Sequence, residues 1–348
     1  YKRQVLALAT VDPSLARSFL PDLVTHSSPF ARAYGAQAAG RLQDSEALRE
    51  LADDPSPNVR TAALQELGTL EGHDADSVIL TSLSQGGDPQ LVLSLAGLLL
   101  GTERRAEAAE AALSALERLS EARWQTLRDA RLALLALVEE TGTVAALSEV
   151  EPYLRDYDPA VARRAASVME SWTGKSYLGA PRPMERLPLP TVEELREMAQ
   201  ATVVLHMARG GSIEIRLLPF QAPTNALRLF KQAEEGVLDG LTFHRVAANF
   251  VIQGGSPGAN EFAGHGTFTR DEVGLHVQWS GTVGLSTRGR NTGDGQIYVN
   301  LVDNLRLDHD YTILGVVTAG MDVAYQVLEG DVIERATIRS ESPVGSGG

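Results

Sequence analysis

The sequence predicts a multidomain chain in which an all-α solenoid of helical repeats precedes a mainly-β closed barrel with flanking helices. Three observations lead to this prediction. Short amphipathic helices that open on proline recur over about residues 1–172. A proline-rich polar stretch follows, and after it β-branched runs alternate with glycine-containing turns. A chain of 348 residues is also about twice the common domain size, which favours two cores over one.

The clearest helical unit is the segment DPSPNVRTAALQELG at residues 54–68. Pro57 lies in the predicted first turn, where its missing N–H leaves no hydrogen bond unmade. Small and apolar side chains from Val59 to Leu67 recur at helical spacing, which predicts one buried stripe. Gly68 follows directly as the predicted C-cap. The unit therefore reads as a short amphipathic helix with both ends marked.

Similar openings mark the other repeats. They begin at Pro29, Pro57, Pro89 and Pro159. The long gap before Pro159 leaves room for a further unit without proline, which we place at residues 124–138. The alanine-rich stretch 106–115 supplies small side chains that let the helices of neighbouring repeats approach closely. This pattern resembles HEAT repeats, with an irregular helical bundle as the alternative. Trp124 and Trp172 are expected to be core residues.

A linker is predicted after the repeats. Residues 175–190 carry four prolines among polar side chains, which is typical of an extended segment. Thr191, followed three residues later by Glu194, predicts a capping box at the start of one short helix. The expected boundaries are 1–172 for the solenoid, 173–200 for the linker and short helix, and 201–348 for the barrel.

Strand signals dominate the last part of the chain. Residues 201–207 and 212–217 are β-rich runs separated by a turn that contains Gly210, which predicts a hairpin. An amphipathic helix is expected to open at Pro223. Its predicted inward side chains are Ala226, Leu229, Phe230 and Ala233. Beyond Gly240, short strands separated by glycine turns predict a closed antiparallel barrel.

Four ordered sequence blocks stand out in this part of the chain. They read TFHRV with NFVIQGG at residues 242–255, GTVGLS at 281–286, NTGDGQIY at 291–298 and LDHDYTILG at 307–315. In order and spacing they resemble the cyclophilin family over about 140 residues. The resemblance implies a cyclophilin-like barrel, peptidyl-prolyl cis/trans isomerase activity, binding of proline-containing peptides and no cofactor.

The chemistry of this reaction suggests which residue acts. Rotation about the amide bond before proline has a barrier of about 18–20 kcal/mol and breaks no bond, so a nucleophile, metal or redox cofactor is not required. The enzyme must bind the twisted amide better than either planar form. The prolyl nitrogen regains a lone pair in that twisted state, and Arg245 is the candidate donor to it. By resemblance, Gln253 holds the guanidinium in place and Gln296 contacts the substrate backbone.

The resemblance also assigns the substrate pocket. An apolar slot for proline is expected from Phe250, Val251, Tyr298, Leu307 and Tyr311, and a peptide-binding rim from Ser286 and Thr287. Several of these residues depart from the best-known members, which carry Met, Phe and His where this chain has Val251, Tyr298 and Tyr311. Arg306 replaces a tryptophan of the drug-sensitive members, so tight cyclosporin binding is not expected.

Several single residues allow more than one interpretation. Arg245 alone could be a surface salt-bridge residue, and His244 and Asn249 are expected to order the loop around it. The glycine pair at 254–255 lacks the Lys-Ser/Thr of a phosphate loop. Arg288 and Arg290 are most simply solvated loop charges, with recognition of an acidic substrate as the alternative. No metal site is expected, because His265, His276 and His309 lack mutual ligand spacing.

Composition limits partners and location. A formal net charge of −14 disfavours nucleic-acid binding, which needs a surplus of Lys and Arg. Cysteine is absent, which excludes disulfide and thiolate chemistry. No apolar run of about 18 residues occurs, so no transmembrane segment is predicted. Because the first residue is Tyr1 and not Met, a removed signal or lipid anchor fits, and a soluble bacterial-type protein of cytoplasm or periplasm is expected.

These observations lead to three hypotheses of function. In the first, the chain is a prolyl isomerase that assists protein folding, and its repeats bind a client or partner. In the second, it is a scaffold that binds proline segments with little or no turnover. In the third, the repeats only tether the enzyme within an assembly and touch no substrate. Turnover of an Xaa-Pro peptide separates the first hypothesis from the second.

Overall fold

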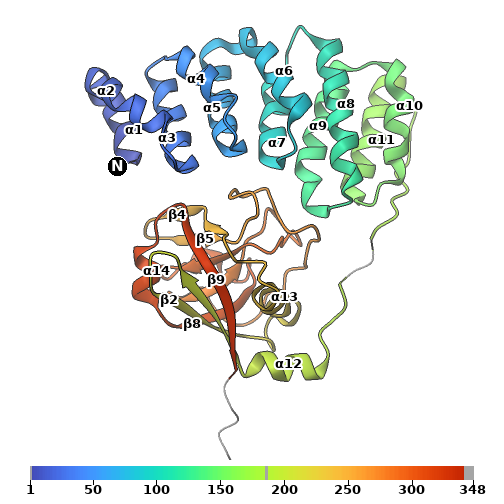
Figure 1. The fold of residues 1–348 in the computed structure, drawn as a ribbon. Helices are drawn as coiled ribbons and strands as arrows, with labels where there is room; N and C mark the ends of the chain where they lie inside the picture. The colour runs from blue at the N-terminus through green and yellow to red at the C-terminus, as the bar shows by residue number, and fades with distance from the viewer. Residues whose placement is uncertain (1, 185–186, 341–348) are drawn as a thin grey trace, which may run out of the picture. The chain divides into compact units, whose positions relative to one another are not determined.

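The computed structural model describes residues 2–184 and 187–340 of the chain (Figure 1). The chain folds into two compact units, Tyr1–Glu185 and Arg186–Gly348. Each unit buries an apolar core of its own, built from helices in the first and mainly from strands in the second. In the part of the chain that the structure describes, no helix is both long enough and apolar enough to cross a membrane.

The first unit is built from short helices that follow one another closely along the chain. Its α-helices are α1 (Lys2–Val11), α2 (Pro13–Val24), α3 (Pro29–Arg41), α4 (Ser45–Leu51), α5 (Pro57–Glu71), α6 (Asp76–Gln85), α7 (Pro89–Leu98), α8 (Arg105–Glu121), α9 (Arg128–Thr141), α10 (Leu147–Val150) and α11 (Pro159–Thr173). Short 3-10 helices join some of them: η1 (Gly72–Ala75), η2 (Gln125–Leu127), η3 (Val144–Ala146) and η4 (Glu151–Arg155).

The predicted helix starts and the predicted close packing are confirmed. Pro29, Pro57, Pro89 and Pro159 are the first residues of α3, α5, α7 and α11. These helices and α9 pack side by side in chain order, so each covers the apolar side of the next (Figure 1). The alanine-rich stretch lies in α8 and buries Ala108, Ala111, Ala112 and Ala115. Small side chains thus allow the rows of helices to approach closely.

Two predictions for this unit are wrong. Gly68 does not end its helix, because α5 continues to Glu71 and ends at Gly72, whose φ of +58° suits glycine. A Cβ atom at position 68 would come within 2.9 Å of the Leu98 side chain, so Gly68 allows close packing on α7. Trp124 is 49% exposed and lies outside the core. The partly buried ring of Trp172 packs against that core as expected.

A recurring ion pair joins helices of this unit. Arg32 is the fourth residue of α3, and its Nε lies 2.6 Å from Oδ2 of Asp54, two residues before the N-cap of α5. Arg131 is the fourth residue of α9 and pairs in the same way with Asp156, two residues before the N-cap of α11. Both aspartates also accept the N–H of the N-cap residue. Each pair therefore holds one helix to the start of a later one.

The linker begins on the helical unit. The N–H of Ala180 donates to the carbonyl of Leu154 at 2.7 Å, and that of Arg182 to the carbonyl of Asp156 at 3.0 Å. The described residues between 175 and 190 form no helix or strand, as predicted, and residues 185 and 186 lie outside the described part. The predicted capping box of Thr191 and Glu194 is confirmed at the start of α12 (Val192–Ala199).

The second unit contains the strands. They are β1 (Ala201–Met207), β2 (Ser212–Leu217), β3 (Thr242–Phe243), β4 (Arg245–Ala247), β5 (Val251–Gly254), β6 (Thr282–Leu285), β7 (Ile297–Asn300), β8 (Ile313–Ala319) and β9 (Asp331–Ser340). Within the described residues they form one nine-stranded antiparallel sheet in the order β3-β9-β1-β2-β8-β6-β7-β5-β4. The two edge strands, β3 and β4, are separated only by His244, and a bridge joins Thr242 to Ser256. These links bring the edges together, as a nearly closed barrel requires.

Helices and alternating strand residues complete the barrel. The helices are α13 (Pro223–Glu234), η5 (Leu305–Leu307) and α14 (Met321–Gln326). All four predicted inward side chains of α13 are buried in the barrel core. Ile252, Val283 and Val299 of neighbouring strands point into the same core. Because side chains alternate across a strand, the residues on either side of these three face the outside of the barrel wall.

The ion pair of Arg131 and Asp156 gives a test of the helical unit. The Arg131 side chain is fully buried, so Arg131→Ala leaves Asp156 as an uncompensated charge in the core. We expect a loss of about 3–5 kcal/mol in the free energy of unfolding. Urea unfolding followed by far-UV circular dichroism measures it. The exposed pair Arg104–Glu107 supplies the control, because Arg104→Ala removes a charge that water already solvates. Equal losses in the two variants would contradict this account.

Candidate active site

Three of the predicted site residues lie on the outer face of neighbouring strands, and most of the others lie in the loops beside them. In the sheet register, Arg245 of β4 is opposite Gln253 of β5, and Gln253 is opposite Tyr298 of β7. Tyr298 is in turn opposite Gly284 of β6. The strand pairing thus places the candidate catalytic arginine, its glutamine and one wall of the pocket next to one another. A shift of one residue in β5 would turn Gln253 into the core.

Gly284 is required by this arrangement. A Cβ atom at position 284 would lie 2.2 Å from the ring of Tyr298, far inside van der Waals contact. Only glycine lets that ring lie across β6, where its hydroxyl donates to Oε1 of Gln278 at 3.1 Å. Burial raises the pKa of Tyr298, so the phenol stays neutral. The buried Tyr298 therefore offers the pocket an uncharged aromatic wall.

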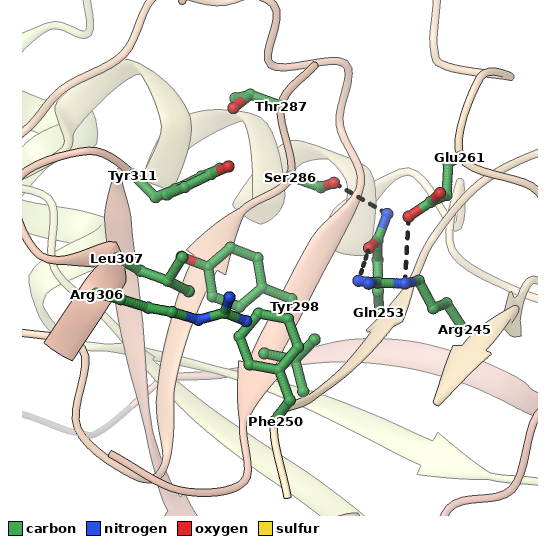
Figure 2. Close-up of a pocket in the computed structure, with 11 residues that line it drawn as sticks. Arg245, Phe250, Gln253, Glu261, Ser286, Thr287, Tyr298, Arg306, Leu307 and Tyr311 are labelled. Carbon is green, nitrogen blue, oxygen red and sulfur yellow. Dashed lines mark hydrogen bonds and ion pairs between the residues drawn. The ribbon is translucent and has the colours of Figure 1, made fainter. Parts of the chain in front are cut away.

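These strands and the loops beside them surround a cavity of about 310 Å³ (Figure 2). Its lining consists of Arg245, Phe250, Val251, Gln253, Glu261, Ser286, Thr287, Tyr298, Arg306, Leu307 and Tyr311. All of the predicted site residues except Gln296 are in this set. The Tyr298 and Tyr311 rings lie nearly perpendicular, at 85°, with their centroids 6.3 Å apart, and Val251 and Leu307 add aliphatic surface. The cavity therefore combines an apolar slot with several polar and charged side chains.

Arg245 is held by two side chains. Its Nη1 donates to Oε1 of Gln253 at 3.3 Å, and its Nε lies 3.3 Å from Oε1 of Glu261. Figure 2 shows both side chains on one side of the guanidinium, and the guanidinium on the same side of the slot as Gln253. Its carbon also lies 5.9 Å from the centre of the Phe250 ring. Among the described residues, no hydrogen bond or ion pair of Arg245 involves Nη2, so this nitrogen can donate to a ligand.

A chain of hydrogen bonds orients Gln253. Its Nε2 donates to Oγ of Ser286 at 2.9 Å and to Oε1 of Gln296 at 3.1 Å, so its oxygen faces Arg245. Gln296 is oriented in turn by acceptors, because its Nε2 donates to Oδ2 of Asp294 at 3.0 Å. The same nitrogen donates to the carbonyls of Glu261 and Ala263. Since a carboxylate and two carbonyls cannot donate, the Gln296 nitrogen must face them and its oxygen must face Gln253. That oxygen can only accept, so it fixes the Nε2 end of the Gln253 amide in turn.

Asp294 is the charged end of this chain. Burial raises the pKa of its carboxyl, and the Arg288 guanidinium, whose Nη1 lies 2.7 Å from Oδ2, opposes that shift. The pairing also decides how Arg288 is interpreted. Arg288 is only 16% exposed and bound to a buried acid, so it is not a solvated loop charge. Arg290 is 61% exposed and pairs with Asp310, as a solvated loop charge would. Neither arginine lines the cavity.

The position of Gln296 differs from the prediction. Its side chain is fully buried behind Gln253 and does not line the cavity, so a bound peptide cannot touch it in this conformation. The resemblance had assigned it to the substrate backbone. The difference has a physical reason, because three protein acceptors already occupy the Gln296 amide nitrogen and Gln253 occupies its oxygen. Its observed role is to orient Gln253.

One residue that sequence reasoning missed is Glu261. It lies in the long loop between β5 and β6, outside the four sequence blocks, and an isolated glutamate there carries no recognisable signal. Arg306 was noted only as a replaced tryptophan, but its guanidinium lies 4.4 Å from the centre of the Phe250 ring. Phe250 is itself presented by a turn in which Asn249 has a φ of +56°, a conformation that asparagine tolerates. This is the loop-ordering role expected of Asn249.

His244 is buried beside the site. Burial lowers its pKa to about 4, and the positive charge of Arg245 acts in the same direction. His265 lies in the loop that also carries Glu261, and its Nε2 is 2.7 Å from the carbonyl oxygen of Gly255. Burial lowers the pKa of His265 as well. Both rings are therefore uncharged at neutral pH.

The low pKa of His244 predicts how stability depends on pH. The unfolded chain binds a proton near pH 6.5, whereas the folded one binds it only near pH 4. The contribution of the uncharged His244 to the free energy of unfolding is therefore fully present above pH 6.5. It falls by about 3 kcal/mol as the pH is lowered to 4. Hydrogen exchange of the Ile252 and Val299 amides measures it in the barrel core. His244→Gln should show a shallower decline, and an unchanged slope would disprove the assignment.

A family model described as "Cyclophilin type peptidyl-prolyl cis-trans isomerase/CLD" matches residues 202–344. A peptidyl-prolyl cis-trans isomerase of Helicobacter pylori is 34% identical over 152 residues, which are 42% of this chain and 91% of that protein. Peptidyl-prolyl cis-trans isomerase B of Bacillus subtilis is 34% identical over 131 residues, 37% of this chain and 92% of that protein.

A cyclophilin type peptidyl-prolyl cis-trans isomerase of Cryptosporidium parvum aligns with a TM-score of 0.38 and 20% identity, over 41% of this chain and 99% of that one. The family assignment rests on the two bacterial relatives, because the match spans nearly their whole length at more than 30% identity. The chain belongs to the cyclophilin-type peptidyl-prolyl cis-trans isomerase family, and its isomerase domain is the C-terminal barrel.

Proposed function

We propose that Arg245 and Gln253 carry the catalytic step of a prolyl isomerase, and that the cavity beside them binds the proline ring. One observation carries this proposal: the Arg245 guanidinium is fixed at the edge of an apolar slot, with one nitrogen left over for a ligand. A guanidinium remains protonated at any physiological pH and is hydrated more weakly than an ammonium group. Arg245 can therefore act as a permanent donor in a partly dry site.

The proposed mechanism uses binding energy alone. A substrate proline enters the slot between Phe250 and Leu307, and the preceding carbonyl turns while the ring stays anchored. As the amide twists, its nitrogen regains a lone pair, and Arg245 donates a hydrogen bond to it. That bond is stronger in the twisted state than in either planar state, which is the condition for acceleration. Gln253 takes part by keeping the guanidinium from rotating away.

The magnitudes agree with this division of roles. Reducing an exchange time from about 100 s to about 10 ms requires about 10⁴-fold acceleration, or roughly 5.5 kcal/mol. A charge-assisted hydrogen bond supplies about 1.5–3 kcal/mol of this. The apolar walls must supply the rest by removing water from the amide and by anchoring the ring. Ser286 and Thr287 are proposed to contact the peptide backbone at the rim of the slot.

The role of Arg245 can be tested by substitution. We expect Arg245→Ala to reduce kcat/KM for an Xaa-Pro tetrapeptide about 10- to 100-fold, because the donor to the twisted amide is lost. Arg245→Lys keeps the charge but loses the planar array that binds both Gln253 and Glu261, so most of the loss should remain. Exchange NMR measures the rates, and circular dichroism verifies folding. Wild-type activity in Arg245→Ala would overturn the proposal.

A proline-binding scaffold with little turnover is the second candidate. One observation favours it: the guanidinium of Arg245 is already paired with Glu261, which lowers the electrostatic gain from donating to a substrate. The two candidates differ in a single measurement. An isomerase accelerates exchange of the tetrapeptide well above the uncatalysed rate. A scaffold binds the peptide in an NMR titration but leaves its exchange rate at background.

We further propose that the helical unit, residues 1–172, consists of HEAT-like repeats that bind a client or partner, so that the whole chain assists protein folding. The recurring Arg–Asp pairs at equivalent helix positions support a repeat. A groove of about 540 Å³ supports a binding surface. It is lined by Ala52, Asp53, Arg60, Ser77, Val78, Thr81, Ser82, Gln85 and Gly86. Hydroxyl and amide groups of this kind suit the backbone of an extended chain.

The groove can be blocked without touching the barrel. Thr81 is exposed on α6, so Thr81→Arg should fold normally while filling the groove. We expect it to slow catalysed refolding of a protein with a proline-limited phase by at least about threefold, and to leave tetrapeptide turnover unchanged. Ser18→Arg on α2 adds the same charge outside the groove and is the control. Equal refolding rates for all three proteins would favour repeats that only tether.

A further inference from the structure

Arg306 differs from the other arginines near the slot. Arg245 pairs with Glu261 at 3.3 Å, Arg288 with Asp294 at 2.7 Å, and Arg290 with Asp310 at 2.7 Å. Within residues 2–184 and 187–340, the exposed Arg306 side chain has no carboxylate partner. The chain has an excess of acidic residues, 45 against 31 Lys and Arg. Acidic residues are therefore plentiful in this chain, and yet the Arg306 cation at the pocket has no carboxylate partner among the described residues.

The nearest acids in the sequence are engaged elsewhere. Oδ1 of Asp308 accepts the N–H of Gln278 at 2.7 Å, and Oδ1 of Asp303 accepts the N–H of Ser280 at 2.9 Å. Both carboxylates thus hold the loop that carries Gln278. Glu261 is paired with Arg245 and lies on the opposite side of the slot from Arg306 (Figure 2). The lining of the cavity therefore carries two cations and one anion, and the cation without a counter-charge is Arg306.

The Arg306 guanidinium is also held in position. It lies 4.4 Å from the centre of the Phe250 ring, within the range of a cation–π contact. Such stacking limits the side-chain rotations that a ligand would otherwise have to freeze. Among the residues that the structure describes, no hydrogen bond or ion pair occupies the Arg306 guanidinium, so its N–H groups are available to bind a carboxylate through two parallel hydrogen bonds. The geometry offers a preoriented, charged fork beside the proline slot.

We infer that Arg306 is a specificity-determining residue that favours substrates with a carboxylate side chain next to the isomerised proline. The inference rests on the proposed function of the slot and extends it to a class of substrate. A lysine at the same substrate position would bring two cations together over Phe250 and lose affinity. Arg288 and Arg290 do not have this role, because each is already paired with a carboxylate.

The test uses two series of tetrapeptides with the full chain. One series varies the residue before proline and the other the residue after it, in each case as Glu, Gln or Lys. We expect the wild type to turn over Glu with a kcat/KM about 3- to 10-fold above that for Lys at one of these positions. The ratio should fall towards 1 at about 1 M salt, where the Debye length is about 3 Å.

The variants decide whether Arg306 is the cause. Arg306→Gln should bring the Glu to Lys ratio close to 1, and Arg306→Glu should invert it. Arg290→Gln removes an arginine outside the cavity and should keep the wild-type ratio. Equal kcat/KM for Glu, Gln and Lys at both positions would overturn the inference, as would a preference for Glu that survives in Arg306→Glu.

Failure of the proposed function would look different. The neutral Gln peptides report on isomerisation itself, so background rates with them would count against catalysis and not against Arg306. The selectivity would then be measured as the ratio of Kd values for the Glu and Lys peptides by NMR titration. Tighter binding of Glu that is lost in Arg306→Gln would support the inference, and equal Kd values would contradict it.

Discussion

A buried carboxylate in the loop before β7, that of Asp294, determines which end of Gln253 faces Arg245. Asp294 accepts from Gln296, whose oxygen then accepts from Gln253, and the oxygen of Gln253 is left for the guanidinium. Each amide has one donor end and one acceptor end, so a fixed acceptor at the start of the chain orients every member. The proposed catalytic geometry therefore depends on a group that no substrate can reach.

The same constraint explains why the site belongs to the barrel wall and not to a loop alone. Ile252 and Val299 are anchored in the core, so the alternate residues Gln253 and Tyr298 must face outward. The burial of apolar side chains on the inner face of the strands thus fixes the positions of the site residues on the outer face. The remaining residues of the site come from outside the strands. A tight turn carries Phe250, the long loop between β5 and β6 carries Glu261, and η5 carries Arg306.

Much of the architecture was predictable because it follows from local rules. Proline at a helix start and the β-rich runs of β1 and β2 depend on nearby residues, and both were predicted at the observed positions. The errors came from contacts between distant segments. Gly68 looks like a cap but accommodates Leu98, and Gln296 looks like a substrate ligand but is enclosed by acceptors from the Glu261 loop. Glu261 itself was missed because only the folded loop brings it to Arg245.

The most direct test of this account is a crystal structure of the chain with a bound Xaa-Pro tetrapeptide. We predict the pyrrolidine ring in the slot against Phe250 and Leu307, with a nitrogen of the Arg245 guanidinium within about 3 Å of the prolyl amide. Gln253 should keep its contact with Arg245. A peptide bound elsewhere on the barrel, or one whose proline leaves Arg245 turned towards Glu261 without contacting the amide, would contradict the central claim.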